Sequence, residues 1–124
     1  MEASILLRSD PTSAYAARNF VADTLEAWGV GLYVMETAVL LASELVANAI
    51  VHARTPIVVG IDSTNDHLKI AVKDNSAQLP TRRLCADELA RGRGLQLVDV
   101  MANRWGSSHD GCGKTVWLEL PSGH

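Results

Sequence analysis

Cysteine is scarce in this sequence, and neither sign of charge dominates it. Cys85 and Cys112 are its two cysteines, and they lack the paired CxxC spacing of a zinc or redox site. We therefore read both as free thiols in a reducing cytoplasm. Lys and Arg together number 11 against 14 Asp and Glu, so the formal charge is −3 and no global positive field exists to hold a nucleic-acid backbone.

Long uninterrupted apolar runs are also missing. The first residues, MEASILLRSDP, have an acidic second position and too short an apolar run for an export signal. Polar residues interrupt the most apolar stretch, 32–53, at Glu36, Ser43, Glu44, Asn48 and His52. A charge near a bilayer centre costs about 2.5–3.5 kcal/mol. We therefore expect a cytoplasmic protein with no membrane contact, in which this stretch is an ordinary helix.

Repeats, low-complexity tracts and linkers are absent as well. The 124 residues are 48% hydrophobic and 20% charged, which are the proportions of a globular protein. We expect one domain over residues 1–124.

Apolar spacings of three and four predict two helices. The first begins after Asp10-Pro11, a helix-start signal, and ends near Gly29, a residue suited to the left-handed position. The second runs from Leu32 to about Arg54 and stops before Pro56, which disfavours helical geometry at the preceding residue.

Alternating patterns predict strands at 4–8, 57–61, 68–73, 105–108 and 115–120. Between them, 74–91 is expected to be a loop and 95–101 a short helix. This order predicts an α+β fold, a two-layer α/β sandwich with a mixed, mostly antiparallel sheet covered by helices on one face.

The second helix carries a polar stripe. Glu44, Asn48 and His52 are spaced i, i+4, i+8 and share one face. A carboxylate and a carboxamide one turn apart suit a Mg²⁺ site beside a general base, because Mg²⁺ prefers oxygen ligands. The alternative is the solvated face of an amphipathic helix.

Two glycine-rich segments could lie against phosphates. Gly92-Arg93-Gly94-Leu95 stands where a loop meets a helix, so its backbone N–H groups could bind phosphate oxygens, or it is a flexible turn. The run 111–115, GCGKT, is not a P-loop, because Ser108 replaces the required glycine and a strand follows. A hairpin turn is the alternative for this run.

Asp74 ends a strand, where it could accept a hydrogen bond from a ligand amine or simply form a turn. His109 and Cys112 flank another turn, but two candidate ligands without supporting spacing do not predict zinc.

In this order, the segments resemble the GHKL ATPase superfamily, and within it the small bacterial anti-sigma-factor serine kinases. Residues 43–52, SELVANAIVH, are similar to the family's N-box, and Asp74 falls where its first glycine box begins. Gly92 to Leu95 match the second box and residues 111–115 the third, so the resemblance extends from Asp10 to Leu120. It implies a Bergerat-type ATP-binding fold.

The resemblance also implies roles. Asn48 would ligate Mg²⁺, and Glu44 would take the proton from an attacking serine hydroxyl. Asp74 would accept a hydrogen bond from the adenine amine, supported by Thr115 in the third box, which also contains Gly113. Gly92, Gly94 and Leu95 would face the phosphates, and His52 would be structural.

The implied function is an ATP- and Mg²⁺-dependent kinase that phosphorylates a serine of an anti-anti-sigma factor and sequesters a sigma factor. Whether the chain forms a homodimer is left open. The first box departs from Asp-x-Gly-x-Gly, because Ser76 and Gln78 replace both glycines. This departure favours an alternative: a nucleotide-binding module without catalysis that regulates its partner by occupancy.

Overall fold

A computed structural model describes residues 1–52, 55–64, 66–74, 101–110 and 113–121. Every helix and strand predicted within these ranges is present, and no bound differs by more than two residues from its predicted position. The elements in chain order are β1 Glu2–Leu7, α1 Thr12–Ala27, α2 Leu32–His52, β2 Ile57–Ser63, β3 His67–Asp74, β4 Arg104–Asp110 and β5 Gly113–Pro121. The expected loop at 75–91 and all of the expected helix at 95–101 except Met101 lie outside the described residues.

Both ends of α1 form as the sequence predicts. The Asp10 carboxylate accepts hydrogen bonds from the backbone N–H and the hydroxyl of Thr12, each at 2.9 Å. The Ser13 hydroxyl donates to the Arg8 carbonyl at 2.6 Å, which ties the first turn to the end of β1. At the other end, Gly29 has φ 74, the left-handed conformation that glycine adopts without strain.

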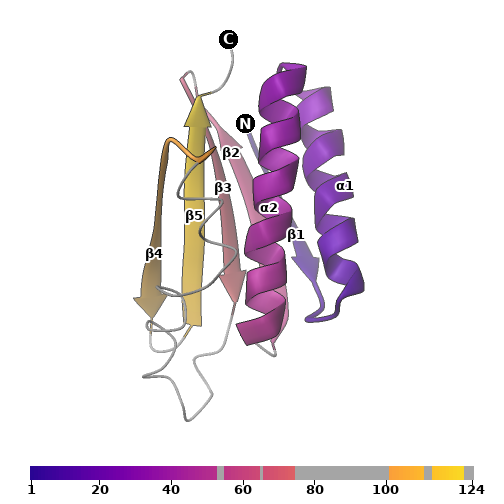
Figure 1. The fold of residues 1–124 in the computed structure, drawn as a ribbon, viewed down its shortest axis with the longest axis vertical. Coiled ribbons are helices and arrows are strands. Elements are labelled where there is room, and N and C mark those ends of the chain that lie inside the picture. The colour runs from indigo at the N-terminus through magenta and orange to yellow at the C-terminus, as the bar shows by residue number, and fades with distance from the viewer. Residues whose placement is uncertain (53–54, 65, 75–100, 111–112, 122–124) are drawn as a thin grey trace.

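The five strands form one sheet in the order β1-β2-β3-β5-β4. All four pairings between them are antiparallel, so among the described strands the sheet is not mixed. Figure 1 shows α1 and α2 side by side on one face of this sheet. The predicted two-layer α+β sandwich is confirmed.

The core lies between the helices and the sheet. On β3 the side chains of Leu68, Ile70 and Val72 are buried, and they alternate with exposed or half-buried residues. Strand β5 follows the same pattern, with a buried set that alternates with half-buried side chains. Its inward-facing residues are Lys114, Val116, Leu118 and Leu120.

Helix α2 is long and apolar enough to cross a membrane by length and composition, over Leu32–Val51. Packing of α2 in the core offers another reason for its apolar composition. A stripe of its side chains is buried in the core, and α2 contacts α1, β2, β3 and β5. The stripe consists of Ala38, Leu41, Ala42, Leu45, Val46 and Ala49. Burial of this stripe accounts for part of the apolar composition of α2.

Candidate functional site

One end of the molecule gathers the end of α2, the end of β3 and the start of β5 (Figure 1). Chain connectivity and sheet register explain this arrangement. Only four residues separate His52, the end of α2, from Ile57, the start of β2. Ile57 pairs with Asp74 at the end of β3, and Lys73 pairs with Thr115 near the start of β5. The candidate residues of α2, β3 and β5 are therefore brought to the same end of the sheet.

Asp74 continues the inward-facing series of β3 and is itself buried. Its side chain therefore lies on the helix-covered face of the sheet, the same face as the apolar side chains of Leu68, Ile70 and Val72. A carboxylate in such a place must have polar partners, because burial of an uncompensated charge is costly. The turn-forming alternative for Asp74 does not explain an inward position in a strand.

Lys114 faces Asp74 from the neighbouring strand. The register that pairs Lys73 with Thr115 sets Lys114 beside Asp74. The Lys114 Nζ lies 3.8 Å from Asp74 Oδ2, and the two side chains are 3% and 2% exposed. Lysine is almost never fully buried unless it is paired. These two residues form a buried ion pair at the end of the sheet.

Lys114 belongs to the glycine-rich run 111–115, and no role was predicted for it from the sequence. A signal for it was nonetheless present. Lys114 precedes Val116, Leu118 and Leu120 at intervals of two, so the alternation that predicts β5 also turns Lys114 inward. The same alternation turns Thr115 to the opposite face, where it is half-buried.

Asn48 lies in the buried stripe of α2. It follows Leu41 and Leu45 at intervals of seven and three, and its exposed fraction is 9%. Glu44, one turn earlier, is half-buried. The solvated-face alternative therefore does not hold for Asn48, because a fully solvated face would leave it exposed. A buried carboxamide next to a half-buried carboxylate is a polar interruption of an otherwise apolar contact surface.

The structure describes only some of the remaining predicted site residues. Gly113 is the buried first residue of β5, next to Lys114. Gly92, Gly94 and Leu95 lie outside the described residues, as do both cysteines. The support of an adenine contact by Thr115 stays a prediction, and the structure places Lys114 on the side of Asp74 instead.

The described side chains contain no group of three or more His, Cys, Asp or Glu that could hold a metal ion. A magnesium ion at Asn48 would therefore take most of its ligands from water and from phosphate oxygens. This is the usual arrangement for Mg²⁺, which binds proteins through one or two side chains and keeps several waters.

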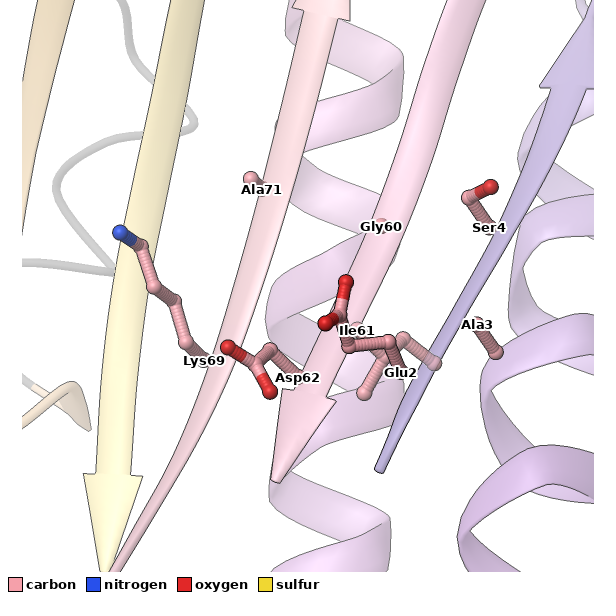
Figure 2. A pocket seen from close by; sticks show the side chains of 8 residues that line it. All are labelled: Glu2, Ala3, Ser4, Gly60, Ile61, Asp62, Lys69 and Ala71. Atoms are coloured by element: carbon pink, nitrogen blue, oxygen red, sulfur yellow. The ribbon is translucent and has the colours of Figure 1, made fainter. Parts of the chain in front are cut away.

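A hollow of about 520 Å³ lies on the sheet face opposite the helices (Figure 2). Its floor is formed by small residues of β1, β2 and β3, and Glu2, Asp62 and Lys69 stand around it. Beside it, Lys69 lies over the ring of Trp117, with Nζ 5.1 Å from the ring centroid. None of the predicted site residues lines this hollow, so it is separate from the candidate site.

A family model described as the histidine kinase-like ATPase domain matches residues 7–120. No curated protein matches the chain. Among solved structures, the chain is similar to a crystal structure of the RsbU and RsbW domains of Rv1364c from Mycobacterium tuberculosis, with 20% identity and a TM-score of 0.74. That match covers 97% of this chain and 32% of the other, so the chain spans about a third of the protein it resembles. The family match extends over nearly all the described elements, and this chain belongs to the histidine kinase-like ATPase domain family.

Proposed function

We propose that this chain binds Mg²⁺-ATP and transfers the γ-phosphoryl group to a serine of an anti-anti-sigma factor, and that in its other state it sequesters a sigma factor. The observation that carries the proposal is the meeting of α2, β3 and β5 at one end of the sheet (Figure 1). Asp74 is the last residue of β3, and Asn48 lies one turn before the end of α2. Glu44 lies one turn before Asn48 on the same helix. Phosphoryl transfer depends mainly on such positioning and on charge stabilisation.

The residues present fit a nucleotide. The Asp74 carboxylate can only accept hydrogen bonds when ionised, which matches the exocyclic amine of adenine. The Asn48 side-chain oxygen is a suitable Mg²⁺ ligand. Bound Mg²⁺ would neutralise charge on the phosphates. Glu44 would hold the proton that leaves the serine hydroxyl, since its half-buried carboxylate is within the same helix one turn from Asn48.

We propose a cytoplasmic protein that acts through protein partners and not through nucleic acid or membrane, with residues 1–124 as one ATPase domain. The net charge of −3 supports the absence of a nucleic-acid partner. The resemblance to an RsbW domain supports the class of partner.

A second candidate is a module that binds nucleotide and regulates its partner by occupancy alone. The observation that favours it is the altered first box, in which Ser76 and Gln78 replace the glycines. Both candidates require ATP binding, so only phosphotransfer separates them.

The separating experiment changes Glu44 to Gln and measures transfer of label from radiolabelled ATP to a purified anti-anti-sigma factor. Glu44→Gln keeps the side-chain size and removes the basic carboxylate, so transfer should fall about 10²–10⁴-fold while ATP binding remains. The matched control is Glu36→Gln, an exposed position two turns earlier on α2, which should transfer at the wild-type rate. Wild-type protein that binds Mg²⁺-ATP and the partner but labels no serine would support the occupancy module instead.

The magnesium role is tested at Asn48. Asn48→Ala should weaken nucleotide binding in the presence of Mg²⁺ more than in its absence, because only the first uses the side-chain oxygen as a ligand. Asn48→Asp retains an oxygen ligand and should keep more of the Mg²⁺-dependent part. Equal losses with and without Mg²⁺, measured by calorimetry, would assign Asn48 to the packing of α2 and not to the metal.

A further inference from the structure

Both described helices cover one face of the sheet, and the described elements leave the opposite face to solvent (Figure 1). Directly paired residues of neighbouring strands point to the same face, so the outward side chains form rows that cross the strands. One such row, the charge row, runs from β2 through β3 and β5 to β4 and consists of Asp62, Lys69, Glu119 and Arg104. The adjacent row, the hollow row, crosses the same four strands and consists of Gly60, Ala71, Trp117 and Gly106.

The charge row is complementary to its own reverse. From β2 to β4 its signs are minus, plus, minus and plus, so reversal of the order changes the sign at every position. A two-fold axis that lies in the interface, parallel to the strands and midway between β3 and β5, relates two face-to-face copies in this way. It sets Asp62 of each copy opposite Arg104 of the other, and Lys69 opposite Glu119. No like charges of this row face each other, and complementary charges favour association.

The hollow row is complementary to its own reverse in shape. On β2 and β3 it has little side chain, because Gly60 and Ala71 line the hollow of about 520 Å³ (Figure 2). On β5 and β4 it holds Trp117 and Gly106, and the indole lies so close over Gly106 that an added Cβ would stand 2.9 Å from the ring. The same two-fold axis brings β5 and β4 of one copy over β3 and β2 of the other. Each indole then faces the hollow of the other copy.

A solvated sheet face is the alternative, and charges of alternating sign also stabilise neighbouring strands within one chain. Arg104 and Glu119 make such a pair, at 3.7 Å. This alternative explains the charge row but not a half-buried indole beside a hollow, and Trp is enriched at protein interfaces. A second copy also fits better than a partner of uniform charge, because the charge row has two charges of each sign and attracts neither an acidic nor a basic surface as a whole. The row on the other side of the hollow row adds no conflict, since its one charge, Lys73, would face Thr115.

We propose that two copies of this chain form a symmetric dimer through the sheet face opposite the helices, with the Trp117 ring of each copy in the hollow of the other. This dimer is independent of the proposed function, because the candidate site lies on the helix-covered side of the sheet. The contact extends over four short strands and includes charged side chains, so the dimer should be weak, with a dissociation constant of about 10–100 μM. At about 1 μM the chain is then mostly monomeric.

Analytical ultracentrifugation of wild type and two charge-reversed variants, without nucleotide, tests the dimer. Asp62→Arg sets positive side chains opposite each other at two places in the interface, and Arg104→Asp sets negative ones there. Each variant alone should dimerise at least about 10-fold more weakly than wild type, because facing like charges oppose association. An equimolar mixture of the two variants should regain the dimer, because a copy of one paired with a copy of the other has opposite charges at both places.

Asp23→Arg and Arg18→Asp are the matched controls, because they make the same charge changes at exposed positions of α1. Each of them should dimerise as wild type does. Ala71→Phe tests the hollow without a change of charge. Its ring would occupy the space that the indole of the other copy enters, so the dimer should again weaken at least about 10-fold.

The outcomes are distinct. Wild type that stays monomeric up to about 1 mM overturns the dimer. A wild-type dimer that neither Asp62→Arg nor Arg104→Asp weakens uses another surface, which overturns it as well, and so does a mixture that stays as weak as its two components. An Ala71→Phe protein that dimerises as wild type does overturns the placement of the Trp117 ring in the hollow.

Discussion

The buried pair of Asp74 and Lys114 makes a quantitative prediction about stability. Replacement of one partner leaves the other as a buried charge, which typically costs about 3–5 kcal/mol. The Coulomb energy agrees in scale: at 3.8 Å and an effective dielectric constant of about 20, it is about 4 kcal/mol. We therefore expect Lys114→Met and Asp74→Leu each to lose about 3–5 kcal/mol of unfolding free energy.

The double variant should behave differently from the sum of the single ones. With Met and Leu side by side, no charge remains to be desolvated, and an apolar replacement of a buried pair is often neutral or stabilising by about 1–4 kcal/mol. Urea unfolding of wild type, both single variants and the double variant gives the coupling energy directly. Nucleotide is omitted, so that binding does not contribute to the measured stability.

The chain contains a matched control for this cycle. Arg104 and Glu119 form an ion pair of nearly the same length, 3.7 Å, but the Arg104 side chain is 69% exposed. An exposed pair is worth about 0–1 kcal/mol, so its coupling energy should be several-fold smaller. Coupling at Asp74 and Lys114 no larger than at this surface pair would refute the reasoning, because burial is the main difference between the two.

Two further predictions concern the framework of the domain. The backbone N–H of Thr12, and then its hydroxyl, lower the pKa of Asp10 below its ordinary 3.8, so this carboxylate stabilises the fold above that pH and the benefit is lost as the pH falls below it. Asp10→Ala should therefore have a lower Tm than wild type at pH 7, and the difference should shrink below pH 3.8; a constant difference would contradict the assignment. Gly106→Ala would bring a Cβ within 2.9 Å of the Trp117 ring and should lower the free energy of unfolding by about 1–3 kcal/mol, as measured in urea. Gly60→Ala is the control, because its Cβ would lie 4.0 Å from the nearest atom, and it should lower the free energy of unfolding clearly less.

The described helices and strands could be predicted from the sequence because each carries a local signal. Period-two apolar patterns and spacings of three and four found all five strands and both described helices. Gly29 identified the end of α1 through its conformational freedom, and φ 74 confirms it. The helices were easiest, since their buried stripes recur over many turns.

Side-chain partners were harder to predict, because they depend on the register between strands. The interpretation of residues 111–115 as a family box singled out Gly113 and Thr115 and passed over Lys114. Only after β5 is aligned with β3 does Lys114 stand beside Asp74. Lysine is also among the residues most often exposed, so composition alone argued against an inward position. Gly92, Gly94 and Leu95 stay predictions, as they lie outside the described residues.

The ion pair links the stability cycle to the proposed function. If an apolar pair at positions 74 and 114 is as stable as the ionic one, the charges are not needed for folding. A double variant that folds with wild-type stability but no longer binds ATP would then assign the pair to the ligand. Retained ATP binding in that variant would instead remove Asp74 from the nucleotide contact. The stability and the ATP binding of this double variant thus show separately whether the charges serve the fold or the nucleotide.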